Sequence, residues 1–425
     1  MNQASFILKG DFCWSKGPDR LETQSGGYLI SVDGLSQGVF EALPERYKAL
    51  PLLDYTGRLI VPGLSDLHVH APQYTFRGLG MDLELLEWLD TVTFPEEARY
   101  ADLAYAKDAY SRFVEDMRRG ATTRACVFAT AHVPATRLLM ELLDGAGLCT
   151  MVGKVNMDRN SPDSLREASA QASAEDTVTW LRKAADAYRH TRPILTPRFI
   201  PSCSDALMER LGEIQREYRL PVQSHLSENL GEVAWVQELC PQSKFYGDAY
   251  DRFGLFGGAA PTIMAHCVLS SEEEQRLMKE RGVYIAHCPA SNTNLSSGVA
   301  PAGKYLREGQ NVGLGSDIAG GSHLSIFRAM ADAIQVSKLR WRLQDMSIKP
   351  LTVPEAFYMG TLGGGSFFGK VGSFEPGYEL DAVVMDDSRL AVARPLTLSQ
   401  RLEKVIYLSE DRDVVGKFVQ GRVIF

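Results

Sequence analysis

The feature that constrains the fold most is a repeated alternation of short, β-branched apolar runs with longer segments of helical periodicity, beginning near Val61. Runs of this length suit buried strands, and the helical spacing between them suits crossover helices. Strands that alternate with helices form parallel sheets, and eight such units favour a closed barrel. We therefore predict an α/β fold of the (β/α)8 TIM barrel type. The eight predicted strands cover residues 63–70, 122–129, 151–157, 194–200, 221–225, 261–267, 283–288 and 312–317.

Several of the intervening helices have recognisable ends. Ser204 suits the N-cap of a helix between the fourth and fifth strands, because its hydroxyl can accept a hydrogen bond from an early backbone N–H. A second helix is predicted over residues 102–119, and Gly120 suits the left-handed residue that often ends a helix. The Ala- and Glu-rich stretch 161–190 also indicates a helix.

Two β-rich flanks surround the predicted barrel. Residues 6–61 contain short apolar runs joined by Gly-rich turns, and similar runs recur at 377–386 and 414–425. We expect the two flanks to pair with each other into a small β-sandwich domain. The predicted division is 1–61 with 371–425 for the β-sandwich domain and 62–370 for the catalytic barrel domain.

Composition favours a protein that acts on small molecules. The 425 residues are 45% hydrophobic and 23% charged, as in ordinary globular proteins. The formal net charge of −8 disfavours nucleic acid, whose phosphates are held by clustered Lys and Arg. None of the seven cysteines forms a C-x-x-C pair, which disfavours a disulfide framework and a thiolate zinc site. Because we find neither a signal peptide nor an apolar stretch of membrane-spanning length, we expect a cytoplasmic protein without a membrane partner.

A His-x-His pair ends the first predicted strand. Side chains alternate between the two faces of a strand, so His68 and His70 project to the same side and can share one metal ion. An isolated pair of this kind is more often two polar residues on a solvated face. Its place at the carboxyl end of a strand favours metal binding, because barrel enzymes carry their active sites at that end.

Three further predicted strands end in residues that suit the same site. His225 offers a third imidazole, and Glu228, three residues later, can take and deliver the proton of an activated water. His266 can orient that water. Burying the Asp317 carboxylate at the end of an apolar strand is costly without a cation, so it suits a fourth ligand or a base. Each residue alone has an ordinary structural explanation, but together they predict a metal-dependent hydrolase.

The remaining histidines are weaker candidates. His287 ends the seventh predicted strand, and both a place beside the site and a structural role are compatible with that position. His132, His190 and His323 lack a suitably spaced partner, so we leave all four outside the predicted metal shell.

These residues carry a family resemblance that spans nearly the whole chain. Segments 61–70 and 225–228, with His266 and the pair Ser316-Asp317, are similar to the amidohydrolase superfamily. The more specific segments, which resemble the guanine deaminases of that superfamily, are 70–74, 86–89, 196–199, 224–229 and 286–292. The resemblance implies a zinc-dependent enzyme that hydrolyses guanine to xanthine and ammonia, and it favours a homodimer.

The resemblance also implies the metal ligands. Two-metal members of the superfamily use a carboxylated Lys, usually on the fourth strand, and residues 194–200 contain no Lys. One zinc ion is therefore predicted, although Lys154 on the third predicted strand leaves a second metal open. The sequence does not distinguish zinc from iron or manganese. The implied ligands are His68, His70, His225 and Asp317.

Gln73, Arg198 and Phe199 are the substrate contacts that the resemblance implies, together with Glu228. Their chemistry agrees, because Arg presents donors that match O6 and N7 of guanine, Gln can donate and accept, and Phe can stack on a ring. A salt bridge beneath the barrel rim is the alternative for Arg198. Trp88 suits either a lid over the pocket or a core position.

The implied mechanism is hydrolytic attack at C2 of guanine. Glu228 carries a proton to the ring nitrogen beside C2, while Asp317 and His266 hold the nucleophile. Related amidohydrolases that act on 8-oxoguanine, a pterin or a triazine stay open as alternatives. A non-catalytic scaffold is disfavoured by the complete ligand set, and the cytidine deaminase fold by the missing C-x-x-C signature.

Overall fold

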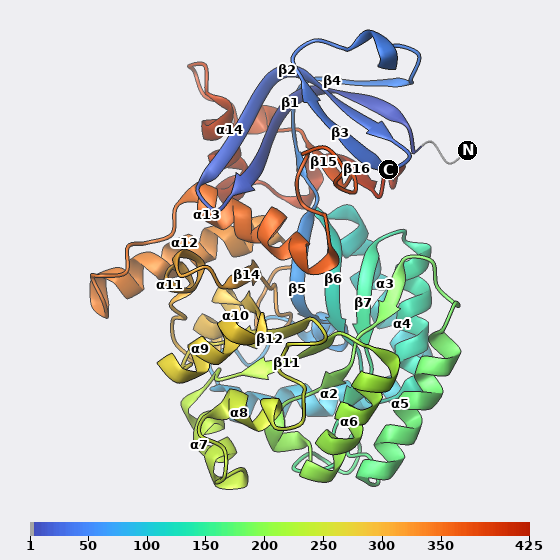
Figure 1. Ribbon diagram of the computed structural model, residues 1–425, viewed down its shortest axis with the longest axis vertical. Coiled ribbons are helices and arrows are strands. Elements are labelled where there is room, and N and C mark those ends of the chain that lie inside the picture. The colour runs from blue at the N-terminus through green and yellow to red at the C-terminus, as the bar shows by residue number, and fades with distance from the viewer. Residues whose placement is uncertain (1–3) are drawn as a thin grey trace.

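The computed structural model describes residues 4–425, and strands alternate with helices through its central part (Figure 1). Strands lie at all eight predicted positions, with the third and fourth broken into two short pieces each. Pro193 and Pro197 lie in the fourth, and proline lacks the N–H that continues a regular ladder. The strands are β5 (Leu64–His70), β6 (Thr122–Phe128), β7 (Cys149–Gly153), β8 (Val155–Asn156), β9 (Thr191–Pro193), β10 (Thr196–Pro197), β11 (Val222–Leu226), β12 (Thr262–His266), β13 (Tyr284–His287) and β14 (Asn311–Leu314).

These strands pair in parallel. Two four-stranded sheets have the orders β5-β6-β7-β9 and β11-β12-β13-β14, and β8 pairs with β10. A bridge between Leu195 and Val222 connects the two groups on one side. On the other side, the backbone N–H of Asp317 donates to the carbonyl of His68 at 2.8 Å, just beyond β14. The carboxyl ends of all these strands therefore meet at one end of the molecule.

Helices follow the strands and cover their outer side in Figure 1. Apolar faces of these helices pack with the strands into one large core. The helices are α1 (Leu85–Trp88), α2 (Phe94–Ala98), α3 (Leu103–Arg119), α4 (Val133–Gly145), α5 (Ala170–Ala184), α6 (Asp205–Tyr218), α7 (Leu230–Leu239), α8 (Tyr246–Asp251), α9 (Glu272–Arg281), α10 (Pro289–Asn294), α11 (Ala302–Arg307), α12 (Ile326–Leu343), α13 (Val353–Tyr358) and α14 (Leu398–Leu408).

Helix ends match the sequence predictions unevenly. Ser204 caps α6 as predicted, accepting from the backbone N–H of Leu207 at 3.1 Å. The prediction for residues 161–190 is too long, because only α5 is helical there. Glu167 explains the shortening, since its carboxylate turns inward and accepts from the backbone N–H of Met157 at 2.9 Å.

The predicted left-handed end of α3 is wrong. Gly120 has φ −73° and an extended ψ, so it leads directly toward β6. A left-handed cap normally satisfies the last carbonyls of a helix. Here the buried ammonium of Lys417 does so, donating to the carbonyls of Met117, Arg118 and Gly120 at 3.0, 3.1 and 2.9 Å. A lysine 300 residues away replaces the local cap.

The two β-rich flanks pair with each other. Seven strands form one sheet in the order β17-β16-β15-β4-β1-β2-β3. The join lies where β4 runs antiparallel to β15, with Val61 opposite Val383. The strands are β1 (Phe6–Gly17), β2 (Arg20–Val32), β3 (Leu35–Phe40), β4 (Leu52–Pro62), β15 (Ala382–Met385), β16 (Val414–Val419) and β17 (Arg422–Val423). Among residues 4–425, no helix is both long enough and apolar enough to cross a membrane.

Candidate active site

Four side chains converge at the carboxyl ends of β5, β11 and β14. His68 and His70 share one face of β5, His225 comes from β11, and Asp317 follows β14. The Nε2 atom of His70 lies 3.2 Å from Nε2 of His68 and 3.2 Å from Nε2 of His225. Oδ1 of Asp317 lies 3.2 Å from Nε2 of His68 and 3.5 Å from Nε2 of His70. The structure thus brings the four predicted ligands together.

The spacing of these donor atoms fits one tetrahedral ion. Zinc binds imidazole nitrogen at about 2.0–2.1 Å, so two donors on a tetrahedron lie about 3.3 Å apart. The distances from Nε2 of His70, 3.2 Å to each of the other two imidazoles and 3.5 Å to Asp317, match that value. Three imidazoles and a carboxylate are also donors that zinc takes in proteins. These residues therefore fit a single zinc ion.

The surroundings of His70 and His225 favour the neutral imidazole that metal ligation requires. Burial is the main cause that lowers the pKa of His70 and His225 well below the usual range. Nδ1 of His225 lies 2.6 Å from the carbonyl oxygen of Arg198. Because a carbonyl only accepts, Nδ1 carries the proton and the lone pair on Nε2 faces the cluster.

Left-handed backbone conformations turn the chain at the strand ends. Ser227, His266 and Asp317 have φ of 46°, 75° and 46°. This region is unfavourable for residues with a Cβ, and such residues concentrate at functional sites. The turn after β14 is held by buried Asp66, which accepts from the hydroxyl of Ser316 and from its backbone N–H at 3.0 Å. These positive φ angles cost conformational energy, and they set the directions in which the three side chains point.

Glu228 is buried beside the ligand cluster. Its Oε2 lies 3.3 Å from Nε2 of His266, and the hydroxyl of Ser297 donates to its Oε1 at 3.4 Å. Burial, together with the nearby carboxylates of Glu232 and Asp317, raises the pKa of Glu228 well above the usual range. The raised pKa makes the Glu228 carboxylate a stronger base, which suits a group that takes a proton from water and then delivers it.

His266 is oriented as a neutral acceptor. Burial lowers its pKa to about 4. Its Nδ1 lies 2.9 Å from the amide oxygen of Asn292, which accepts the Nδ1 proton and leaves the lone pair on Nε2. That lone pair faces Glu228 and, at 3.7 Å, Oδ2 of Asp317. His266 lies where it can accept a hydrogen bond from a molecule placed between the two carboxyl groups.

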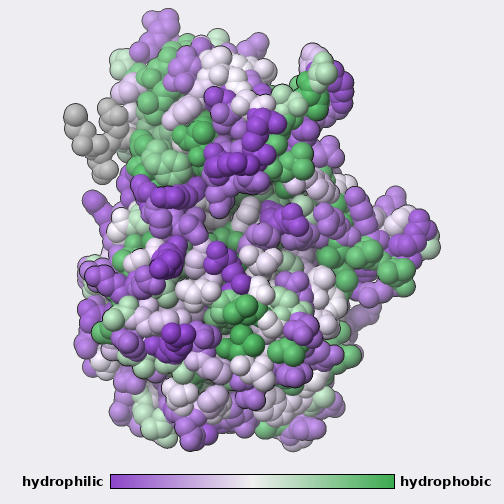
Figure 2. All heavy atoms as spheres, turned by 180° about the vertical axis from the view of Figure 1, so that it is seen from behind, coloured by the Kyte–Doolittle hydropathy of each residue, from purple (hydrophilic) through white to green (hydrophobic). Residues whose placement is uncertain are grey.

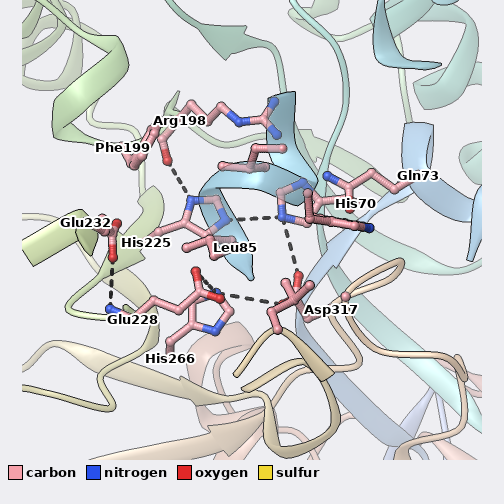
Figure 3. Close-up of a pocket in the computed structure, with 14 residues that line it drawn as sticks. His70, Gln73, Leu85, Arg198, Phe199, His225, Glu228, Glu232, His266 and Asp317 are labelled. Atoms are coloured by element: carbon pink, nitrogen blue, oxygen red, sulfur yellow. Dashed lines mark hydrogen bonds and ion pairs between the residues drawn. The ribbon is translucent and has the colours of Figure 1, made fainter. Parts of the chain in front are cut away.

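A cavity opens onto this cluster (Figure 3). Gln73, Arg198 and Phe199, the predicted substrate residues, all line it. Trp88 is almost fully buried and also lines the cavity, which agrees with a core position, and a role as a lid stays a prediction. The lining residues are His70, Gln73, Leu85, Trp88, Leu89, Arg198, Phe199, His225, Glu228, Glu232, His266, Leu295, Asp317 and Gly320.

Other candidate residues lie elsewhere. Lys154 is fully buried and forms an ion pair with Glu167, on the side facing α5. Its amine is therefore occupied, which removes the support for a second metal bridged by a carboxylated Lys. His287 is buried but lies outside the cavity lining as far as residues 4–425 define it. His132, His190 and His323 also lie outside the ligand cluster.

Two carboxylates of the site were not found by sequence reasoning. Glu97 accepts hydrogen bonds from both Gln73 and Arg198. Glu232 lines the cavity, and its carboxylate accepts from the backbone N–H of Glu228 at 3.0 Å. Both follow the start of a helix, where an acidic residue ordinarily indicates a solvated first turn. No sequence signal distinguishes them from the many exposed glutamates of this chain.

Comparison with known proteins agrees with this geometry. The sequence model of the amidohydrolase family matches residues 59–424, which is most of the chain. The chain belongs to the amidohydrolase family. The match includes β5, β11, β12 and β14, the four strands that carry the predicted ligands, His266 and Glu228.

Individual amidohydrolases resemble this one more closely. Guanine deaminase of Dictyostelium discoideum is 39% identical over 380 residues, covering 88% of this chain and 84% of that protein. Human guanine deaminase is 37% identical over 378 residues, with 86% and 82% coverage. A crystal structure of guanine deaminase from C. acetobutylicum with bound guanine in the active site has 48% identity and a TM-score of 0.96, covering 99% of this chain and all of the other.

Proposed function

We propose that this amidohydrolase is a zinc-dependent guanine deaminase, which converts guanine and water to xanthine and ammonia. The observation that carries the proposal is the match in fold and sequence, over 99% of the chain, to a guanine deaminase crystallised with guanine. The cavity supports it independently, because Arg198 and Gln73 offer polar groups to a heterocycle and Phe199 offers an aromatic face.

One zinc ion is the proposed metal. His68, His70, His225 and Asp317 would hold it, since their donor atoms have tetrahedral spacing and face one point. When bound, zinc supplies a Lewis acid that makes water a nucleophile near neutral pH. Only Lys154 favoured a second metal, and its pairing with Glu167 withdraws that support.

The side chains of the cavity account for the proton transfers of the reaction. Water adds to C2 of guanine, and Glu228 takes one of its protons and delivers it to the ring nitrogen beside C2 that carries none. His266 and Asp317 orient the attacking oxygen, since Nε2 of His266 lies close to both Glu228 and Oδ2 of Asp317. Glu228 then transfers the second proton to the amino group, the C2–N bond breaks, and ammonia leaves xanthine behind. Water supplies every proton that moves, so no other reactant is needed.

We also propose that the central strands close into a TIM barrel spanning residues 62–370. The contacts between Leu195 and Val222 and between Asp317 and His68 support closure, because they link the two parallel sheets on both sides. For residues 1–61 and 371–425 we propose a β-sandwich made by bending the seven-stranded sheet. The bridge between Leu35 and Glu379 supports it, since it joins the β3 edge to the chain entering β15.

Substrate identity is tested by ammonia release from the purified protein. Guanine, 8-oxoguanine, adenine, cytosine, a pterin and a triazine are assayed on one preparation whose zinc content is measured. We expect guanine to be turned over at least about 100-fold faster than the others, because the pocket pairs with several polar atoms of one ring. If another ring is turned over faster than guanine, the protein is still a hydrolase, but that ring is its substrate.

A homodimer is the proposed assembly. Leu339 and Leu343 on α12, with Met346 just after it, are exposed large apolar side chains. Hydrophobic groups gather on the projecting part of the molecule in Figure 2, and α12 forms a projecting arm in Figure 1. Apolar surface of this kind favours association. Light scattering is expected to give about twice the 47.0 kDa chain mass, and a monomer at micromolar concentration would contradict the proposal.

A further inference from the structure

A buried carboxylate joins the two polar residues at one end of the cavity. Glu97 lies on α2 and is 3% exposed. It accepts from both terminal nitrogens of Arg198, the Nη2 contact being 3.1 Å, and from Nε2 of Gln73 at 2.9 Å. In the described chain, Glu97 is not among the residues that line the cavity. It therefore reaches a bound ring only through Arg198 and Gln73.

Glu97 fixes which way the Gln73 amide faces. Oε1 of Gln73 accepts from the backbone N–H of Ala319 at 2.9 Å, and Nε2 donates to Glu97. A backbone N–H can only donate and a carboxylate can only accept, so the amide cannot flip. One N–H of Nε2 stays available beside the cavity. Gln73, which in water offers a donor or an acceptor, is restricted here to presenting a donor.

Arg198 is held by the same helix. Its guanidinium carbon lies 5.0 Å from the ring centre of Phe94, one helical turn before Glu97. Two of its five N–H groups are used by the two contacts with Glu97, and a guanidinium has no acceptor. The cationic head is almost fully buried, where only a carboxylate keeps it in place at low cost. Arg198 therefore also presents only donors to the cavity.

We propose that Glu97 is a positioning residue that sets substrate specificity, by making Arg198 and Gln73 a rigid edge of N–H donors. This inference rests on the proposed function. Figure 3 shows Arg198 and Gln73 on the side of His70 and His225 away from Glu228. When C2 of guanine faces Glu228, the opposite edge of the ring carries O6 and N7, and both are acceptors. A ring with an amino group or hydrogen at position 6 leaves N–H donors of Arg198 and Gln73 unpaired. Such a ring is therefore bound less well than guanine.

The test compares guanine with 2-aminopurine, which has the same C2 amine but no O6. In Glu97→Gln the new amide offers one acceptor to the three donors that Glu97 now binds, so Arg198 and Gln73 lose their fixed orientation. We expect the ratio of kcat/KM for guanine to that for 2-aminopurine to fall about 10- to 100-fold, mainly through a higher KM for guanine. Glu96→Gln is the matched control, because Glu96 contacts Arg99 and Tyr105 outside the cavity. Glu96→Gln should leave kcat/KM unchanged for both substrates.

The outcomes separate the inference from the function on which it rests. If the wild-type protein does not prefer guanine, the proposed function and the inference both fail. If the wild-type protein prefers guanine and Glu97→Gln keeps the full preference, only the inference is overturned. A general packing defect would lower kcat/KM equally for both substrates, so it would not change the ratio. Should Glu97→Gln be insoluble, the double variant Glu97→Gln/Arg198→Met removes both buried charges. A retained preference for guanine in that variant would overturn the inference as well.

Discussion

Replacing His225 by alanine is expected to lower bound zinc from about one atom per chain to less than about a tenth, and guanine deamination at least about 10³-fold. The reason is geometric, because Nε2 of His225 is one of four donors that face the same point. Three remaining donors leave the ion more weakly held and open to competing water. Without the ion, water keeps its ordinary high pKa and is a poor nucleophile at neutral pH.

The control for this variant is His190→Ala. His190 precedes β9 at the opposite end of the strands and contacts Gln420, so its loss removes a histidine without touching the cluster. Zinc is measured by elemental analysis of gel-filtered protein, and activity by ammonia release before and after adding zinc. Full zinc content and near-normal turnover in His225→Ala would contradict the ligand assignment. Loss of zinc in His190→Ala would indicate a general effect on folding instead.

Replacing Glu228 by glutamine is expected to reduce kcat about 10²- to 10⁴-fold while zinc stays bound. Glutamine keeps the size of the side chain but cannot exchange a proton. The carboxyl of Glu228 is placed for that exchange, since it lies 3.3 Å from Nε2 of His266 and its raised pKa makes the carboxylate a stronger base. A carboxylate with an ordinary pKa of about 4.3 would be a weaker base, so it would take up the proton of the attacking water less readily.

Two further variants locate the effect of Glu228. Glu228→Asp keeps a carboxyl group on a side chain that is one methylene shorter. It is expected to recover part of the rate that Glu228→Gln loses. Glu238→Gln removes a charge from an exposed position of α7 and should leave kcat unchanged. Single-turnover measurements would separate the chemical step from product release. Wild-type kcat in Glu228→Gln would exclude Glu228 from proton transfer.

The ligand set could be read from the sequence because strand geometry is local. Alternation along β5 places His68 and His70 on one face whatever the rest of the chain does. His225, His266 and Asp317 each lie at or near the end of a predicted strand, and parallel strands bring their carboxyl ends to one place. Sequence reasoning could therefore state which residues meet without knowing how far apart they lie.

Other features depend on contacts between residues far apart in the chain. Whether Gly120 ends α3 in a left-handed conformation was decided by Lys417, which takes the carbonyls that such a turn would satisfy. The length of α5 was decided by Glu167 and its inward contacts with Lys154 and Met157. Propensity and capping rules describe isolated helices, and a buried charge from elsewhere outweighs them.

The sequence by itself determined the alternation of strands and helices, the residues that meet at the strand ends and the chemistry they suit. Only the tertiary structure decided the orientation and protonation of those residues. The carbonyl of Arg198 selects the His225 nitrogen that faces the cluster, and Glu97 turns Arg198 and Gln73 into donors. The physical reason is that hydrogen bonds and burial act at a few ångströms. Glu97 and Arg198 are 101 positions apart in the chain, so only folding brings them together.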